Sequence, residues 1–237
     1  MNTVEGVVDP VKIKISFKPE STNNKIKFGG GIRSNGLRII CDGDNINIDI
    51  GSGVSINGVI RICSNCKLII GNNLTASNPC YWYIGEGTVC KIGNDCMFSS
   101  NITFRTDDSH AIYSVTDCKR INVSRDISIG NHVLIFPDCK ILKGTIIDDG
   151  SIVAANTICS NSHISNNAMV AGAPYKYCKL NVAWDKTYVN SQTFQTSTPE
   201  MVKEKNAKYW HKTVVTEDVV RKCSKSAMKD LIELLNG

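Results

Sequence analysis

Apolar residues recur at every sixth position between residues 129 and 159. The steps land on Ile129, Ile135, Ile141, Ile147, Val153 and Cys159, and the fourth residue after each of the first five is small or β-branched: Val133, Cys139, Thr145, Ser151 and Thr157. An α-helix repeats every 3.6 residues or so and a half-buried strand about every 2, so neither produces this period. A period of six predicts a parallel β-helix, in which stacked short faces bury a continuous aliphatic column.

The same period occurs earlier in the chain. Steps of six give Ile50, Ile56, Ile62, Leu68 and Leu74, with Val54, Ile60 and Cys66 in the companion position. The phase slips within residues 77–89 and resumes at Ile92, Phe98 and Phe104. We therefore predict an all-β solenoid over residues 25–180, with a turn that absorbs the slip.

The repeat is interrupted once more, over residues 105–126, and then continues. Such an interruption is an excursion loop, and insertions in repeat proteins gather on the binding face. Residues 1–24 are polar and contain one alternating run, residues 11–15, which predicts a strand that caps the open end of the solenoid.

The remaining residues, 181–237, predict a C-terminal helical extension. Thr198 before Pro199 and Thr216 before two acidic residues are helix N-cap signals. Seven apolar residues at helical spacing predict one stripe, which would dock on the solenoid or on a neighbouring subunit: Val219, Val220, Cys223, Ala227, Leu231, Leu234 and Leu235.

Composition narrows the class of protein. The 237 residues are 42% hydrophobic and 21% charged, as in a globular protein with a sizeable core. The net charge of +5 suits anionic small ligands, and no arginine-rich run indicates nucleic acid. No apolar run long enough for an integral membrane segment is present, nor is the pattern of a signal peptide.

The 11 cysteines are scattered singly and indicate free thiols in a reducing compartment, so we expect a cytoplasmic protein. Cys63 and Cys66 form a CxxC pair, but no second ligand pair follows at zinc-binding spacing, and we predict no metal.

Candidate chemistry lies in the excursion loop, where His110 follows Asp107 and Asp108. A histidine can accept a proton near neutral pH, and a nearby carboxylate can orient its ring. By itself this arrangement is also that of a solvated loop histidine. The other three histidines are better explained as structural or solvated residues.

Residues from about 25 to 186 resemble the hexapeptide-repeat acyltransferases, most of all the branch that O-acetylates bacterial surface polysaccharides and sialic acids. The segments IGNDCMFSSNITFRTDDSHAIY, RINVSRDISIGNHVLIFPDCKILKGTIIDDGSIVAANT, MVAGAPYK and VAWDK carry the resemblance, in the family's order. It implies a left-handed parallel β-helix with roughly eighteen residues, or three hexads, per coil. It also implies a homotrimer with active sites between subunits and acetyl-CoA as acyl donor.

The resemblance further implies the site residues. His110 matches the general base of the family, and Asp108 would orient His110 or contact the acceptor. Arg105, Asp107 and Ser109 would bind the acceptor sugar, and the alternative role for Arg105 is a structural salt bridge. The cofactor-binding positions would be Lys143, Gly144, Ala154, Ala155, Ala171, Lys176 and Lys179, with the lysines of the last turn near the CoA phosphates.

The chain departs from the family pattern at Leu134, where relatives commonly have Trp, and at Ala173, where they have Asn. The sequence therefore does not identify the acceptor. The resemblance favours an O-acetyltransferase acting on a bacterial glycan. The alternatives are N-acylation of an amino-sugar nucleotide, acetylation of a small xenobiotic, and a non-catalytic β-helix scaffold.

Overall fold

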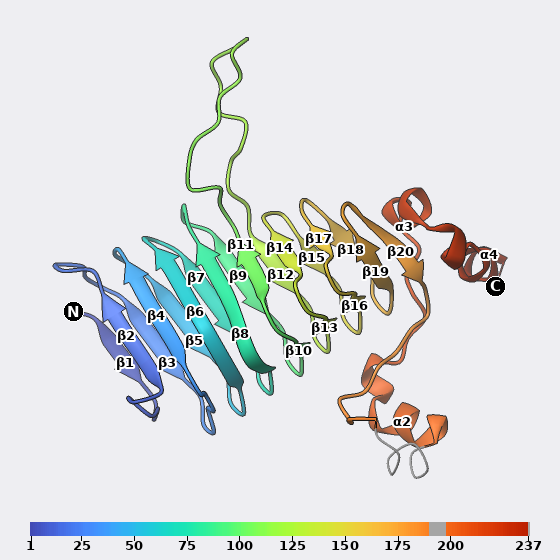
Figure 1. Ribbon diagram of the computed structural model, residues 1–237, viewed down its shortest axis with the longest axis horizontal. Helices are drawn as coiled ribbons and strands as arrows, with labels where there is room; N and C mark the ends of the chain where they lie inside the picture. Colours follow the sequence, from blue (N-terminus) through green and yellow to red (C-terminus); the bar gives the residue numbers. More distant parts are fainter. Residues whose placement is uncertain (190–197, 237) are drawn as a thin grey trace.

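The computed structural model describes residues 1–189 and 198–236, apart from the side chain of Ser77. These residues form a long parallel β-solenoid, from which one arm projects, and a helical region at its C-terminal end (Figure 1). Three ladders of parallel strands run along the solenoid. They form an eight-stranded sheet and a second sheet of 12 strands.

The eight-stranded sheet is the first ladder and contains one strand from each coil. Its members are β1 (Thr3–Glu5), β3 (Lys25–Phe28), β5 (Asn47–Ile50), β7 (Lys67–Ile70), β9 (Val89–Ile92), β12 (Ile127–Ile129), β15 (Ile146–Ile147) and β18 (His163–Ile164).

The second sheet bends, and therefore supplies the other two ladders. The second ladder follows from the start of β8 (Thr75–Ile84) through β10 (Met97–Phe98), β13 (Leu134–Ile135), β16 (Ile152–Val153) and β19 (Met169–Gly172), and ends in antiparallel β20 (Tyr175–Lys179). The third ladder contains β2 (Ile13–Phe17), β4 (Leu37–Asp42), β6 (Ser55–Cys63), the end of β8, β11 (Ile102–Arg105), β14 (Lys140–Leu142) and β17 (Ile158–Cys159).

The buried column confirms the six-residue phase. Every anchor from Ile129 to Cys159 is at most 1% exposed, and so are the companions Thr145, Ser151 and Thr157. The anchors from Ile50 to Leu74 and from Ile92 to Phe104 are buried as well. Trp82, which lies within the phase slip, is also buried, and its ring stacks on that of the anchor Phe104 with centroids 5.4 Å apart.

The coils differ in length between the two halves of the solenoid. Ser128 pairs with Ile146, a spacing of eighteen residues, as the family resemblance implies. Lys25 pairs with Asn47, a spacing of twenty-two. The extra residues in the N-terminal coils lengthen β6 and β8, each of which turns a corner between two ladders.

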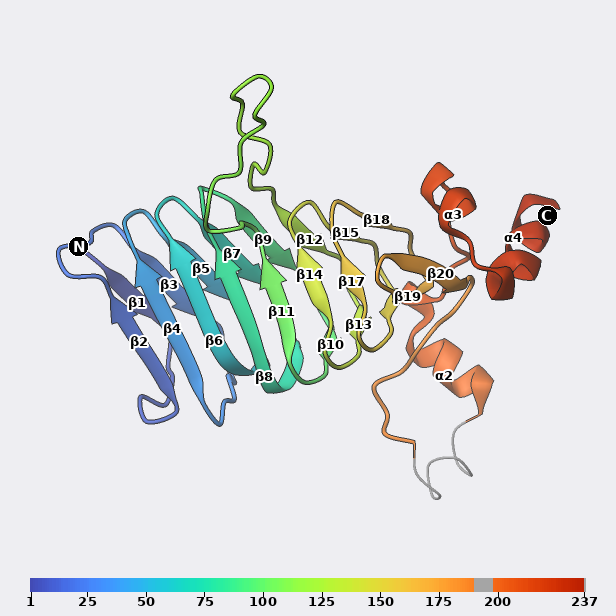
Figure 2. The same cartoon turned by 45° about the horizontal axis from the view of Figure 1, so that its top comes forward.

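Residues 1–24 continue the solenoid. β1 pairs with β3, and β2 pairs with β4, both in parallel, so these residues form the first coil and cover the buried side chains of the second. Residues 106–126, between β11 and β12, leave the solenoid as the projecting segment seen in Figures 1 and 2, which we call the arm.

The C-terminal region contains α2 (Pro199–Lys205), the 3-10 turns η1 (Ala207–Tyr209) and η2 (Lys225–Ala227), α3 (Glu217–Lys222) and α4 (Met228–Asn236). Both N-caps are confirmed, because the Thr198 and Thr216 side chains accept backbone N–H groups of their helices. The prediction of one continuous helical stripe is wrong, although Val219, Ala227 and Leu231 do pack into the core cluster of the solenoid. The helix breaks at Cys223, which is extended and bridges to Tyr177, so that Val220 and Leu235 are exposed while Val219 and Leu231 are buried.

The chain after β20 is fastened to the side of the solenoid by His132. Its ring lies between those of Trp184 and Tyr209, at centroid distances of 4.1 and 4.4 Å, and its Nδ1 is 2.8 Å from the Asp95 carboxylate. This buried histidine is structural, as the sequence suggested. No helix among the described residues is long and apolar enough to cross a bilayer.

Candidate active site

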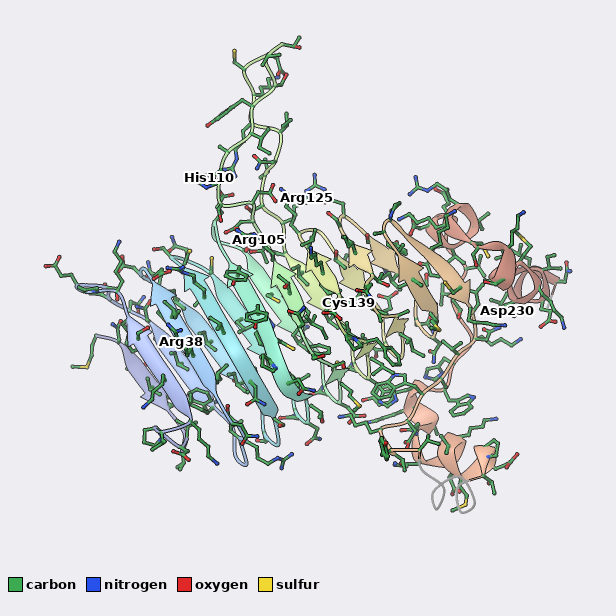
Figure 3. All side chains as sticks on the ribbon, in the orientation of Figure 1. Arg38, Arg105, His110, Arg125, Cys139 and Asp230 are labelled. Atoms are coloured by element: carbon green, nitrogen blue, oxygen red, sulfur yellow. The ribbon has the colours of Figure 1, made fainter. Side chains whose placement is uncertain are left out.

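The base of the arm gathers most of the chemistry-bearing residues. The segment leaves the solenoid after Arg105 and returns at Arg125, whose backbone N–H donates to the Thr106 carbonyl. Figure 3 shows His110 on the outgoing limb of the arm, near Arg105, and Arg125 on the returning limb. The third and first ladders meet at this corner, so the site lies on an edge of the solenoid.

Arg105 organises the first turn of the outgoing limb. Its guanidinium donates to the Asp107 carbonyl at 2.9 Å and to the Ser109 hydroxyl, and lies 3.4 Å from the Asp107 carboxylate. It also covers the Tyr83 ring, at 5.2 Å from the centroid. The three residues expected to bind the acceptor are thus brought together, and Tyr83 joins them.

Asp108 contacts Lys143 rather than the imidazole of His110. The Lys143 ammonium donates to the Asp108 carboxylate and to the Asn122 carbonyl, the latter at 3.1 Å. The hydrogen bond from Lys143 is the main reason why the pKa of Asp108 is lower than usual. Within the described ranges, no hydrogen bond reaches the His110 ring, which is exposed and accessible to an incoming hydroxyl.

Asn122 holds the two limbs of the arm together, and the sequence analysis did not identify it. Its amide nitrogen donates to Asp108 at 2.9 Å and to the His110 carbonyl at 2.8 Å. Its amide oxygen accepts the Ile112 N–H at 2.7 Å and an Arg120 N–H at 3.2 Å. The residue is only 8% exposed in an otherwise open segment, so one side chain ties the Asp108 carboxylate to the backbone of His110 and Ile112.

A second tie joins the returning limb to the preceding coil. Arg120 pairs with Glu86 at 2.7 Å, and the Ser124 hydroxyl donates to the same carboxylate. The hydrogen bond from Ser124 is the largest cause of the lowered pKa of Glu86. The signal in the sequence for Asn122 and Glu86 is weak, because each is an isolated polar residue outside the repeat.

The expected cofactor positions divide between two corners of the solenoid. Lys143 and Gly144 lie beside the arm, where a Cβ on Gly144 would meet Asn161 at 2.5 Å and its φ is +72°. Ala154 and Ala155 follow β16, at the corner between the second and third ladders. Within one chain, the structure does not bring these alanines to His110.

Ala171, Lys176 and Lys179 belong to the β19–β20 hairpin, one coil beyond the two alanines. A cleft of about 380 Å³ lies beside this hairpin, lined by Ile158, Ser160, Ser162, Ala173, Pro174, Tyr175 and Lys222. The lysine that lines this cleft is therefore Lys222 of α3, which neither the periodicity nor the family resemblance indicated.

The charges at the cleft are linked through Asp218. Burial opposes ionisation of this carboxyl, but hydrogen bonds from Tyr175, Arg221 and Lys222 lower its pKa overall. Lys222 lies 3.0 Å from the Tyr175 hydroxyl and over its ring. Two cations thus share the Asp218 carboxylate beside the apolar wall of the cleft.

The structure shows how the potential metal ligands and the cysteine thiols are placed. Across the described ranges, no group of three or more His, Cys, Asp or Glu side chains is arranged to hold a metal ion. All 11 cysteines are free, and burial raises the pKa of the Cys90 thiol to about 12. Cys66 is buried in the column, which explains the CxxC pair by packing.

Comparison with known proteins identifies the class. The chain is 31% identical over 206 residues to the polysialic acid O-acetyltransferase of Neisseria meningitidis, a match that covers 84% of this chain and 95% of that protein. The crystal structure of the polysialic acid O-acetyltransferase OatWY superposes with a TM-score of 0.65, at 26% identity, over 84% of this chain and 98% of that one.

A second solved structure, that of the polySia-specific acetyltransferase NeuO, matches with the same TM-score of 0.65 at 24% identity, over 82% of this chain and 91% of that one. It supports the fold. No protein-family profile matches the chain.

These findings define a left-handed parallel β-helix enzyme of the acyltransferase class, as the resemblance implied. The chain belongs to the family of hexapeptide-repeat O-acetyltransferases that includes the polysialic acid O-acetyltransferases. The scaffold alternative is thereby set aside in favour of an enzyme.

Proposed function

We propose that this enzyme transfers an acetyl group from acetyl-CoA to a hydroxyl of a bacterial surface glycan. The observation that carries the proposal is the 31% identity over 95% of the length of a polysialic acid O-acetyltransferase. The geometry at the base of the arm agrees with it, because His110 presents an exposed imidazole beside the Arg105 cluster.

His110 acts as the general base in this proposal. Its imidazole takes the proton of the acceptor hydroxyl as the hydroxyl oxygen forms a bond to the thioester carbonyl carbon. The resulting tetrahedral oxyanion collapses, the C–S bond breaks, and the CoA thiolate receives the proton from the imidazolium. No step needs a protein thiol, and seven of the 11 free cysteines are buried.

The donor would use the corner of Ala154 and Ala155 and the hairpin of Ala171, as the family resemblance implies. The cleft beside that hairpin offers Pro174 and Tyr175 as an apolar wall, with Lys222 as a point charge for a phosphate. Lys176 and Lys179 are exposed on the neighbouring strand and would add to the positive potential.

A homotrimer would bring the two corners together. The arm carries exposed apolar side chains, with Val115 98% exposed and Ile121 64% exposed. The outer side of the second ladder carries one apolar row in register: Met97, Leu134, Ile152 and Met169. Both surfaces suit burial against other protomers. In the trimer, the arm of one protomer would reach the donor corner of the next, in the reducing cytoplasm that the free cysteines suit.

The first test is calorimetric titration of the purified protein with acetyl-CoA, followed by an assay of acetyl transfer to polysialic acid. We expect saturable binding at one site per subunit and incorporation of acetyl groups as O-esters. Donor binding with transfer only to amino-sugar nucleotides would support N-acylation instead. No donor binding by the folded protein would refute acetyl-CoA as the donor.

A further inference from the structure

The third ladder presents an outer surface that leads from the first coil to the base of the arm. Strand register places its outward side chains in two rows. One row is Lys14, Arg38, Val59, Tyr81 and Thr103, and the other is Ser16, Ile40, Arg61, Tyr83 and Arg105. We call this surface, formed by the outward residues of β2, β4, β6, β8 and β11, the Arg38 face (Figure 3).

Four of the ten side chains in the two rows of the Arg38 face are cations. The described side chains of these five strands include one outward carboxylate, Asp42, and Arg61 pairs with it at 2.5 Å. Lys14 and Arg38 are exposed and make no ion pair with any described residue. The face therefore keeps positive charge, with the Tyr81 and Tyr83 side chains partly exposed among the cations.

A cleft adjoins this face where the chain enters β2 and β4. It measures about 360 Å³, and its walls include Lys12, Arg33, Ser34 and Asn35, with one carboxylate from Asp9. The Asp9 carboxylate accepts the Val11 N–H, so part of its capacity is used within the turn. Two cations next to hydroxyl and amide groups match a sugar that carries a carboxylate and several hydroxyls.

The Arg38 face is continuous with the candidate active site. Arg61, Tyr83 and Arg105 occupy successive positions in one row, and the Arg105 guanidinium lies over the Tyr83 ring. Neighbouring strands are about 4.8 Å apart, so the three steps from β4 to β11 span about 14 Å. A single sugar cannot cover that distance, whereas an extended chain of sugars can.

We propose that the Arg38 face and the Arg33 cleft bind an acidic polysaccharide chain at a distance from the sugar that is acetylated. The inference rests on the proposed function and extends it from the reacting hydroxyl to the polymer that bears it. Each exposed contact is weak, but several contacts with one polymer chain increase the overall affinity, because the first contact raises the effective concentration of the next. The positive charge of the face also raises the rate at which an acidic polymer associates.

The test measures the affinity of charge-reversal variants for acidic polymers, by calorimetry in low and in high salt. Arg33→Glu with Arg38→Glu is compared with Lys25→Glu with Lys27→Glu, which makes the same charge change at exposed positions of β3, on the first ladder. The probes are long-chain polysialic acid and polygalacturonate, with dextran as the neutral polymer. Circular dichroism and thermal melting check that both double variants fold.

We expect the Arg33→Glu, Arg38→Glu variant to lose about tenfold or more in affinity for both acidic polymers and to show a weaker salt dependence. The Lys25→Glu, Lys27→Glu variant should lose much less. Equal losses in the two variants would show general attraction to a basic protein and overturn the proposal. No loss in either variant, or no binding of acidic polymers by the wild-type protein, would also overturn it.

The same samples separate this inference from the proposed function. Wild-type protein that binds polymer through the Arg38 face but transfers no acetyl group would refute the proposed function alone. Protein that acetylates polysialic acid with no special loss in the Arg33→Glu, Arg38→Glu variant would refute the inference alone.

Discussion

The solenoid interior and the arm are held in place by different interactions. In the solenoid, Ile141 and the other anchors are at most 2% exposed and form one continuous apolar column. In the arm, most apolar side chains are exposed. Asn122 joins the two limbs, and the ion pairs of Lys143 with Asp108 and of Arg120 with Glu86 tie the arm to the neighbouring coils.

This difference separates stability from reactivity. Burial of the column provides the free energy of folding, because apolar burial contributes in proportion to area. The polar contacts of the arm add little to global stability but fix the backbone around His110. Substitutions in the column should therefore unfold the protein, and substitutions in the arm should change activity while the solenoid stays folded.

The largest effect is expected for Ile141→Asp. The variant places an unpaired carboxylate in the apolar column, at a cost on the order of 5 kcal/mol or more, which is comparable with the whole stability of a domain. We expect loss of the cooperative thermal transition, measured by circular dichroism. Ile146→Asp is the control, because Ile146 points outward from the next coil and is 43% exposed. A cooperatively folded Ile141→Asp protein would contradict the six-residue phase.

Substitution of His110 should affect activity alone. His110→Ala removes the proposed base, so we expect kcat to fall roughly 100- to 10,000-fold with little change in acetyl-CoA affinity or melting temperature. His211→Ala is the matched control, since His211 is exposed in the C-terminal region and its ring contacts only the Lys208 carbonyl among described residues. Near-normal turnover of the His110 variant would remove this residue from the mechanism.

Substitution of Asn122 should give an intermediate effect. Asn122→Ala leaves the His110 carbonyl and the Ile112 N–H without their hydrogen-bond partner, and this loss costs about 1–2 kcal/mol. If that energy is lost from the transition state, kcat falls about tenfold. The effect should lie in kcat more than in KM, with the same pH profile as wild type, because the base itself is unchanged. Asn47→Ala, at an exposed position of β5, is the control. Unchanged kinetics would show that the arm does not need this clamp.

The smallest expected effect is the change in arm stability when Asp108 is protonated. Lys143 lowers the pKa of this carboxyl, so its contribution to arm stability is fully present above the ordinary aspartate pKa and is lost as pH falls through the lowered value. Nuclear magnetic resonance of the carboxyl carbons should show Asp108 titrating below the usual range. The titration should move upward in Lys143→Met. An unshifted midpoint in that variant would mean that Lys143 does not hold the carboxylate.

The sequence was informative wherever the fold repeats. The burial of Ile129 and Ile50 and of the anchors that follow them could be read from the period of six, because each buried position faces its neighbours one coil away. The arm boundaries near Arg105 and Ile127 also follow from the interruption of that period. The sequence predicted one continuous helical stripe near the C-terminus, but a β-bridge from Cys223 to Tyr177 interrupts the helix.

The site was predictable in part. Arg105, Asp107 and Ser109 lie together as neighbours along one limb would. The partner of Asp108 was not predictable, because Lys143 is 35 residues away and reaches the arm from the next coil. The position of Lys222 at the cleft could not be predicted for a similar reason, because the C-terminal helices return to the solenoid beside the β19–β20 hairpin.

By itself, then, the sequence determined the column and the place where the chain leaves it, because burial of apolar side chains at a fixed period is a local property of each hexad. Only the tertiary structure decided which polar groups meet at the arm and along the Arg38 face. Those contacts depend on which residues of separate coils fall in register, and coil lengths of eighteen and twenty-two residues shift that register from one half of the solenoid to the other.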